Sequence, residues 1–517
     1  MSRKADRSMS RRSVLKKGAV AVGGAAAVLG GGAPFAQAPS TSSGQGAPAV
    51  LRGAQTGRRF RAALGGAQNL SFEELRLLPI QDRHVVVRTE ATAPCYTLVL
   101  NGIGGTPSVD PAVVAAARGA GPGGGAAGAG AAGAAAPGAG AGAPGAGARG
   151  AGPGAGAAGA AGAGAPGAGG GRGPQVPNIG NHTFVGIVEA VGSQVKRVQP
   201  GDRVVVGVTS QCGQCYQCLR GRADACQFTF GLTPGSFPPI AERADGTRIG
   251  AALGIGGFSE LNVVMEEYTC PVFTDVPAAQ LSLFGDTAAT GVASAMCLIE
   301  IEPGSDVVVL GAGAIGMSAI QAARIMGAGQ VIAVEPVRHR RDLALKLGAT
   351  TVLDPNAEGT NLVARIQELC KGQTDRLFAG GRGAGGNRGS DFTIEAVGRC
   401  GDRPKVEQPP DPTGILPMTQ AWQMTRRGGS IVYLGFGQVG TVSFPASALA
   451  NNGRTLISGQ QGGLNFMRDI PRFVRLVERG QLDLKSMVTS TWRLDQLRSA
   501  FQVLADRTEM CPVVVFA

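Results

Sequence analysis

Alternating apolar and polar residues predict short strands in the first part of the chain. The segments 84–93 (HVVVRTEATA) and 184–191 (FVGIVEAV) have this alternating pattern, which is typical of a strand with one buried face. The segment 256–272 (GGFSELNVVMEEYTCPV) predicts a further strand region. These stretches indicate a mostly β domain. The segment 281–300, with helical spacing and small residues, would join it to the next domain.

The pattern changes near residue 306, where predicted strands alternate with helices. The segment 306–336 reads as an apolar strand, a glycine turn, a helix and a second strand, which together form one βαβ unit. Continued alternation predicts a parallel sheet. The predicted fold class is therefore α/β, with a doubly wound parallel sheet beside a mostly β domain. Later strands are expected at 349–354, 390–398 and 428–436, and a helix is expected at 363–371.

Glycine is concentrated in one tract, so the composition has to be considered without it. The chain has 517 residues, of which 44% are hydrophobic, and this suffices for two or three domains with sizeable cores. Residues 104–173, however, are almost wholly glycine, alanine and proline. Such a segment cannot bury enough side chain to offset the entropy lost on ordering, so we expect a disordered insert. Shorter inserts are expected at 378–389 and 405–417.

The first 38 residues have the features of an export signal. Arg11 and Arg12 precede a weakly apolar, glycine-rich run, and Ala36-Gln37-Ala38 follows it, which is typical of a twin-arginine signal cleaved after Ala38. A basic disordered tail is the alternative, and the run is too short for the ~20 apolar residues of a membrane span. We expect a periplasmic or extracellular protein, with the cytoplasm as the alternative.

The charge of the chain does not indicate nucleic-acid binding. The formal net charge is +12, and the export segment accounts for half of it, because it has seven Lys/Arg and one Asp. The sequence has 5% aromatic residues and no basic stripe interleaved with them. No nucleic-acid partner is therefore expected.

Four cysteines have the spacing of a metal site. Cys212, Cys215, Cys218 and Cys226 follow the pattern C-x2-C-x2-C-x7-C, so short turns could place four thiolates around one tetrahedral zinc ion. Four protein ligands leave no open position, which makes the predicted site structural. A disulfide or a chance cluster is the alternative.

A glycine motif in the βαβ unit predicts a dinucleotide site. Gly311, Gly313 and Gly316 form G-x-G-x-x-G between the strand and the helix, where glycines allow a pyrophosphate to approach the helix N-terminus. Glu335 ends the second strand and would bind the ribose hydroxyls, which favours NAD over NADP. The alternative is a glycine turn that binds no ligand. Three basic residues nearby weaken the preference for NAD: Arg338, Arg340 and Arg341.

These motifs resemble the zinc-containing alcohol dehydrogenases of the medium-chain dehydrogenase/reductase family. The turn Asn181-His182-Thr183, the turn Pro200-Gly201-Asp202 and the four-cysteine lobe follow in the family's order. The resemblance covers the chain from about residue 60 to its end, apart from the inserts. It implies a GroES-like catalytic domain with the zinc lobe and a Rossmann domain. After the signal at 1–38, we expect a linker at 39–60, the catalytic domain at 61–287, interrupted by 104–173, the dinucleotide-binding domain at 288–458 and a return to the catalytic domain at 459–517.

The resemblance also implies a catalytic zinc ion. Carried over by motif, Cys95, His182 and Asp286 would bind this ion and leave one position for the substrate oxygen. Thr97 matches the family's proton relay, so a zinc alkoxide would transfer hydride to NAD. Taken singly, these residues could instead be a buried thiol, a turn histidine, a helix cap and a strand hydroxyl. The implied cofactor-binding residues are Gly311, Gly313, Gly316, Glu335, Arg340 and Thr290.

Some positions depart from the family's pattern. Thr183 and Leu98 stand where relatives have acids, and Tyr96 and Leu100 stand where relatives often have histidine or arginine. Carboxylates in the outer shell orient metal ligands, and their loss weakens metal binding or activity. The alternative hypothesis is therefore a non-catalytic, zinc-stabilised NAD-binding protein with a degenerate catalytic metal site.

Two segments resemble the nicotinoprotein-like members of the family, which use an artificial electron acceptor. They are the run Ala333-Val334-Glu335-Pro336-Val337 and the segment 245–260 (DGTRIGAALGIGGFSE). This resemblance implies a tightly bound NAD that is reoxidised in place by an external acceptor. The substrate would be an alcohol or aldehyde, and the family's usual assembly is a homodimer or homotetramer.

Overall fold

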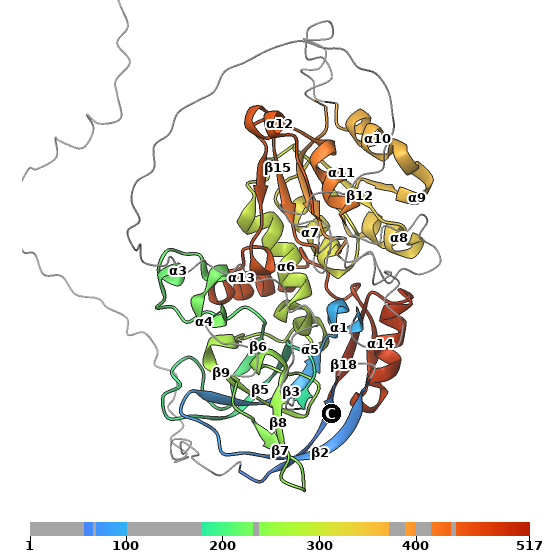
Figure 1. The fold of residues 1–517 in the computed structure, drawn as a ribbon. Helices are drawn as coiled ribbons and strands as arrows, with labels where there is room; N and C mark the ends of the chain where they lie inside the picture. The colour runs from blue at the N-terminus through green and yellow to red at the C-terminus, as the bar shows by residue number, and fades with distance from the viewer. Residues whose placement is uncertain are drawn as a thin grey trace, which may run out of the picture. The chain divides into compact units, whose positions relative to one another are not determined.

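In the described ranges of the computed structural model, the chain forms three sheets (Figure 1). The export segment, the Gly/Ala/Pro insert and most of the two shorter inserts lie outside these ranges, and so do the predictions made for them. The structure describes residues 56–65, 69–100, 177–230, 237–371, 388–398, 415–435 and 441–517.

The first sheet is a small closed barrel with the strand order β1-β2-β7-β8-β4. Phe60, Leu75 and Ile249 are almost fully buried and belong to the apolar cluster of this barrel. Alternation of apolar residues along β1 and β2 places Phe60 and Leu75 inside the barrel. The strands are β1 (Arg59–Leu64), β2 (Ser71–Leu77), β4 (Asn178–Ile179), β7 (Ala241–Glu242) and β8 (Arg248–Ala251).

The second sheet brings together strands from both ends of the described chain. Its order is β10-β6-β5-β3-β18-β17, and β9 also pairs with β3. Val87 lies opposite Val188 in the antiparallel pair of β3 and β5, and Val514 of β18 lies opposite Thr92. The strands are β3 (His84–Thr92), β5 (Phe184–Val191), β6 (Arg203–Val206), β9 (Leu261–Met265), β10 (Thr269–Pro271), β17 (Val488–Trp492) and β18 (Cys511–Val515).

The third sheet is parallel and has the order β13-β12-β11-β14-β15-β16. Val307 and Val309 pack on the face covered by α7, while Val308 and Leu310 pack on the face covered by α10 and α11. Covered faces explain the continuous apolar run of β11. The strands are β11 (Asp306–Leu310), β12 (Gln330–Val334), β13 (Thr351–Leu353), β14 (Ser390–Glu395), β15 (Thr425–Tyr433) and β16 (Thr455–Ile457), and the covering helices are α7 (Ala314–Ile325), α10 (Leu362–Leu369) and α11 (Leu416–Met424).

The predicted helical segment 281–300 is not one continuous helix. Asp286, with φ −149° and ψ −80°, leaves the helical region and separates a 3₁₀ turn, η4 (Ser282–Gly285), from α6 (Thr287–Ala293). The small residues allow close packing on α7, since a Cβ on Gly291 would lie 2.1 Å from the Ile315 carbonyl oxygen. The break therefore positions Asp286 between two packed segments.

The remaining helices are short, apart from α8, α13 and α14. Within the described ranges, no single helix is long and apolar enough to cross a membrane, although the bent pair Ala278–Gly285 and Thr287–Leu298 reaches that length and composition together. These helices are α1 (Tyr96–Leu100), α3 (Tyr216–Leu219), α4 (Gln227–Phe230), α5 (Ala278–Leu281), α8 (Arg338–Lys346), α9 (Pro355–Glu358), α12 (Ala446–Asn451), α13 (Phe466–Glu478) and α14 (Leu497–Ala505).

Candidate metal and dinucleotide site

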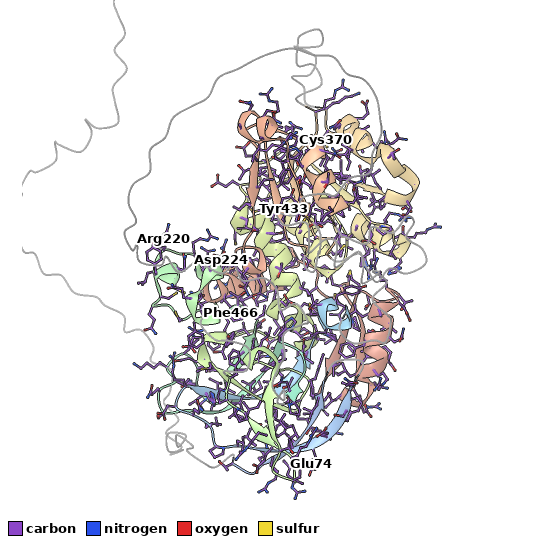
Figure 2. The ribbon with its side chains drawn as sticks, viewed as in Figure 1. Glu74, Arg220, Asp224, Cys370, Tyr433 and Phe466 are labelled. Carbon is purple, nitrogen blue, oxygen red and sulfur yellow. The ribbon has the colours of Figure 1, made fainter. Side chains whose placement is uncertain are left out.

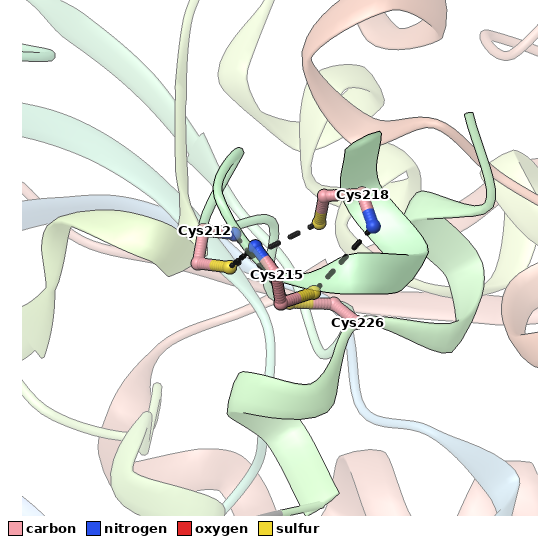
Figure 3. Close-up of side chains that lie close together, drawn as sticks. All are labelled: Cys212, Cys215, Cys218 and Cys226. Carbon is pink, nitrogen blue, oxygen red and sulfur yellow. Dashed lines mark hydrogen bonds between the residues drawn. The ribbon is translucent and has the colours of Figure 1, made fainter. Parts of the chain in front are cut away.

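The four predicted lobe cysteines converge in the structure (Figure 3). Their sulfur atoms all lie within 4.8 Å of one another, and the four thiols are free. The Cys212 and Cys218 sulfurs are 4.0 Å apart, close to the edge of about 3.8 Å that a tetrahedron with Zn–S bonds of about 2.3 Å requires. The donor set therefore fits one tetrahedral zinc ion, as the spacing predicted.

Backbone N–H groups in the lobe favour the thiolate form of Cys215. The N–H groups of Cys218 and Gln227 each donate to the Cys215 sulfur at 3.5 Å. Burial acts to raise the pKa of Cys215, but these backbone hydrogen bonds prevail and lower it to about 6. Gly213 makes the first turn of the lobe possible, because its φ of 76° is disfavoured for other residues. Among the lobe cysteines, Cys215 is thus favoured as a thiolate, whereas burial raises the pKa of Cys212 and Cys218.

The second predicted ligand set also converges, although its residues are far apart in the sequence. One ligand atom from each of Cys95, His182 and Asp286 lies within 4.8 Å of the others. His182 Nε2 lies 3.2 Å from Asp286 Oδ2, close to the tetrahedral edge of about 3.3 Å expected for zinc bonds of 2.0–2.1 Å. The three residues therefore fit an open zinc site with three protein ligands.

Asn181 explains how His182 reaches Cys95 from the far side of the long insert. Asn181 has φ 72°, a left-handed conformation that asparagine tolerates better than most residues. Its Nδ2 group donates to Thr92 Oγ1 at 2.6 Å and to the Ala93 carbonyl oxygen at 3.1 Å. The histidine turn is therefore tied to the end of β3, immediately before Cys95.

The electrostatics of this site favour a cation. Burial acts to lower the pKa of His182, but the hydrogen bonds to Asp286 and Cys95 and their charges prevail and raise it to about 10. Burial acts to raise the pKa of Asp286, and the hydrogen bond and charge of His182 instead hold it below its ordinary value. A buried thiol, imidazole and carboxylate in this arrangement suit a divalent ion.

Thr97, the predicted proton relay, and Thr183, which stands where relatives have an acid, make different contacts. The Thr183 hydroxyl donates to the Val206 carbonyl oxygen at 3.2 Å. An added Cβ at Gly285 would lie only 1.6 Å from this hydroxyl oxygen, so Thr183 packs tightly under the turn before Asp286. The Thr97 hydroxyl donates to the Cys95 sulfur at 3.1 Å. Thr97 therefore lies at the candidate zinc site, whereas Thr183 supports its backbone.

A cavity of about 610 Å³ extends from Cys95 and Thr97 to the glycine turn after β11. Gly311, which has φ 84°, and Gly313 line this cavity. A Cβ on Gly313 would meet no protein atom within 4 Å, whereas a Cβ on Gly316 would lie 1.7 Å from the Gly311 carbonyl oxygen. Gly313 therefore leaves room for a ligand at the start of α7, while Gly316 allows the turn to pack on the helix.

Glu335 also lines the cavity and joins the glycine turn to the end of β12. Its carboxylate accepts hydrogen bonds from the N–H of Ala312 at 2.7 Å and from the N–H of Val337 at 3.0 Å. Arg341 donates to the carbonyl oxygen of Glu335 at 2.8 Å and pairs with Asp354 at 3.0 Å. Arg341 is thus engaged by its neighbours, and the Glu335 carboxylate is fixed in the wall of the cavity.

Arg340 lines the cavity, but Thr290 does not. Burial lowers the pKa of Arg340, and its Nη2 donates to the Glu509 carbonyl oxygen at 3.3 Å. Its buried Nε has no hydrogen-bond partner among the described residues. Thr290 was expected at the cofactor, yet its hydroxyl donates to the Asp286 carbonyl oxygen at 2.8 Å. Thr290 caps the backbone of Asp286 because it lies one turn further along α6.

The sequence did not single out Arg507 or Gln461. Arg507 lines the cavity, has φ 56°, and places its guanidinium 5.7 Å from the centre of the Tyr96 ring. Gln461 donates from Nε2 to the Gly285 carbonyl oxygen at 2.9 Å and to Asp286 Oδ1 at 3.4 Å. Neither residue belongs to a recognisable motif, so only the fold brings them to the site.

Known protein families match both the mostly β part and the dinucleotide-binding part of the chain. A family model described as zinc-binding dehydrogenase matches residues 314–401, and one described as alcohol dehydrogenase GroES-like domain matches residues 160–274. The chain is 30% identical over 346 residues to the NDMA-dependent alcohol dehydrogenase of Amycolatopsis methanolica, which covers 66% of this chain and 85% of that protein. It is 31% identical over 353 residues to the geraniol dehydrogenase of Castellaniella defragrans, with 66% and 84% covered.

Solved structures have the same fold. The alcohol dehydrogenase zinc-binding domain protein from Burkholderia ambifaria has a TM-score of 0.64 and 23% identity, and covers 89% of this chain and 99% of its own. Benzyl alcohol dehydrogenase from Acinetobacter calcoaceticus has a TM-score of 0.62 and 22% identity, with 89% and 100% covered. These similarities confirm the predicted fold class, with a GroES-like part and a dinucleotide-binding part.

Proposed function

The chain belongs to the family of zinc-containing alcohol dehydrogenases, and from this premise we propose that Cys95, His182 and Asp286 are its catalytic zinc ligands. The enzyme is a zinc-dependent oxidoreductase that transfers hydride between an alcohol or aldehyde and NAD. One observation supports the assignment above all. The ligand atoms of the three residues lie within 4.8 Å of one another, and Cys95 lines the same cavity as Gly311 and Gly313.

The side chains around the candidate zinc site can bind and orient an alcohol. Zinc bound there would act as a Lewis acid that polarises the substrate oxygen. Thr97 lines the cavity beside Cys95, so its hydroxyl is placed to accept and pass on the alcohol proton. Ala93, Pro94 and Leu283 also line the cavity. These apolar side chains would exclude water from the reacting atoms and favour an alcohol with an apolar body.

The far part of the cavity supplies a binding site for NAD. The turn at Gly313 and the N-terminus of α7 would receive the pyrophosphate, and Arg340 and Arg507 reach the same cavity. Glu335 would accept the hydroxyls of the adenosine ribose and repel a 2′-phosphate. Because Arg341 is engaged by Asp354 and by backbone carbonyl oxygens, it does not offset this repulsion. Glu335 therefore favours NAD, whereas Arg340, which lines the same cavity and has a buried Nε without a partner among the described residues, acts in the opposite direction.

We further propose that NAD stays bound between turnovers and is reoxidised by an external acceptor. The 30% identity to an NDMA-dependent alcohol dehydrogenase supports this cofactor mode. The twin-arginine signal expected at 1–38 supports it too, because an exported enzyme has no free NAD pool. A purified mature protein should then show NADH absorbance after addition of an alcohol alone. Loss of all nucleotide on simple desalting would contradict tight binding.

Gel filtration should show a homodimer or homotetramer.

Zinc analysis tests the function directly. We expect about two zinc ions per chain, one in the four-cysteine lobe and one at the open site. Cys95→Ser should remove one zinc and abolish alcohol oxidation, whereas the lobe should keep its own ion. A wild-type content of about one zinc that Cys95→Ser leaves unchanged would instead support a non-catalytic NAD-binding protein. The threonine at position 183, where an acid would orient the histidine, favours that second candidate.

A further inference from the structure

Gln461 approaches the candidate zinc site from a segment that supplies none of its predicted ligands. It lies in the short 3₁₀ turn η8 (Gln460–Gly462), between β16 and α13. Its side chain is buried, with 7% of the residue exposed, and its backbone has φ 47°. Residues other than glycine rarely adopt this left-handed conformation, so the surrounding structure has to hold it in place.

The contacts of Gln461 distinguish the two oxygens of Asp286. Gln461 Nε2 donates to Asp286 Oδ1 at 3.4 Å, while Asp286 Oδ2 lies 3.2 Å from His182 Nε2. Gln461 Nε2 also donates to the Gly285 carbonyl oxygen at 2.9 Å. Both groups are acceptors, which fixes the orientation of the Gln461 amide, because a flipped amide would place oxygen against oxygen.

We propose that Gln461 is a positioning residue that restricts Asp286 to binding zinc through Oδ2 alone. The proposal rests on the proposed function of Cys95, His182 and Asp286 as ligands. The hydrogen bond from the Gln461 amide to Oδ1 opposes a rotation of the carboxylate that would bring both oxygens to the ion. A neutral amide at this point orients the ligand without adding charge, in a site where Thr183 stands at the position of the usual outer-shell acid.

The turn η8 packs closely against two neighbouring segments. A Cβ on Gly462 would lie 2.3 Å from the Thr290 carbonyl oxygen, so the turn packs directly against α6, which follows Asp286. On its other side, a Cβ on Gly459 would lie 3.0 Å from Asp224 Oδ2 in the four-cysteine lobe, where Figure 2 labels Asp224. The turn therefore contacts both the lobe and the helix that begins beside Asp286.

The same segment is attached to the lobe a second time. The N–H of Met467, in the first turn of α13, donates to Gln211 Oε1 at 2.9 Å. Gln211 directly precedes Cys212, the first cysteine of the lobe. The lobe thus supports the backbone on both sides of Gln461, and through Gln461 it supports Asp286.

A pair of variants in neighbouring glutamines isolates the amide of Gln461. Gln461→Met keeps the length of the side chain and the backbone constraint at φ 47°, but it removes the two donated hydrogen bonds. Gln460→Met, in the same turn, is the matched control, since Gln460 is only half-buried and donates no bond to Asp286. Zinc release from each protein into a chromogenic chelator is followed over time.

The expected result is a change in one of two release phases. Gln461→Met should speed the release of the open-site zinc 10- to 100-fold, the range for loss of an outer-shell partner, and leave the lobe phase unchanged. Cobalt substituted at the open site should show an altered d–d spectrum, which a merely structural role would not produce. Gln460→Met should match the wild type in both measurements.

Failure of this proposal is distinguishable from failure of the proposed function. If the wild type binds two zinc ions and Gln461→Met releases both at wild-type rates with an unchanged cobalt spectrum, the positioning role is wrong. If the wild type binds only the lobe zinc, the ligand assignment itself is wrong.

Discussion

Gly313→Ala should weaken cofactor binding and Gly316→Ala should lower stability, although the two glycines belong to one turn. The Gly313 backbone, with φ −72° and ψ −169°, is accessible to alanine, and an added Cβ meets no protein atom within 4 Å. At Gly316, the Cβ would lie 1.7 Å from the Gly311 carbonyl oxygen, where real Cβ atoms stay beyond 3.0 Å. The first change fills ligand space, and the second disrupts the fold.

The structure gives the size of each effect. Gly316→Ala must displace the helix or the turn by more than an ångström, and overpacking of this kind costs about 3 kcal/mol. Gly313→Ala should change the free energy of unfolding by less than about 1 kcal/mol, because a poorer N-cap and a less flexible unfolded chain offset each other. Its methyl group should displace the pyrophosphate from the N–H groups of α7, which costs about 2 kcal/mol, or roughly 30-fold in Kd.

Urea unfolding and NADH titration together test this reasoning. Gly313→Ala should unfold like the wild type and bind NADH more weakly, whereas Gly316→Ala should unfold at a clearly lower urea concentration. NADH binding by Gly313→Ala with the wild-type Kd would refute the placement of the cofactor at this turn. Equal stability of Gly316→Ala and the wild type would refute the tight contact with Gly311.

Three further predictions concern the rest of the molecule. Arg507→Gly should weaken NADH binding about 10-fold in a fluorescence titration. The lost contact with Tyr96 should lower the free energy of unfolding by about 1 kcal/mol at most, because glycine is unstrained at φ 56°; Arg338→Gly, at an exposed position, should bind NADH normally. Cys215→Ser should remove one zinc per chain and cost about 3 kcal/mol or more in urea unfolding, since metal binding is folding energy; an unchanged zinc content would contradict the lobe assignment. Burial lowers the pKa of His84 to about 4 from its ordinary 6.5, so the unfolded chain takes up the proton first and stability is lost as the pH falls from 6.5 through 4. In His84→Asn, the side-chain oxygen can accept the Gln81 N–H that His84 Nδ1 accepts. The free energy of unfolding of this variant should therefore fall by about 3 kcal/mol less than that of the wild type over this pH range. Equal acid sensitivity of both proteins in urea unfolding would contradict the assignment.

Much of the fold was predictable because its signals are local. The apolar runs that became β11 and β12, and the glycines between them, specify a βαβ unit within about thirty residues. The cysteines of the lobe lie within fifteen residues, so their spacing alone restricts the geometry. The break at Asp286 was not predictable, because small residues with helical spacing are compatible with one continuous helix. Tertiary contacts with α7 and η8 determine where that helix stops.

The candidate metal site shows where sequence reasoning depends on the fold. Cys95, His182 and Asp286 could be assigned only through a family's motif order, since 86 residues separate the first two and 103 separate the last two. What brings them together is the side-chain amide of Asn181, which bonds to the end of β3, and the non-helical backbone at Asp286.

Residues that orient the ligands are harder to predict than the ligands themselves. Motifs record groups that contact a metal or cofactor, whereas an orienting partner needs only a side chain of suitable length on any nearby segment. Gln461 lies 175 residues beyond Asp286. Beside His182, where an outer-shell acid was expected, the chain has Thr183 instead. The loss of an orienting acid beside one ligand therefore does not establish a degenerate site, because a residue from another part of the chain can orient a different ligand. In this protein, the four-cysteine lobe and the turn η8 provide that support.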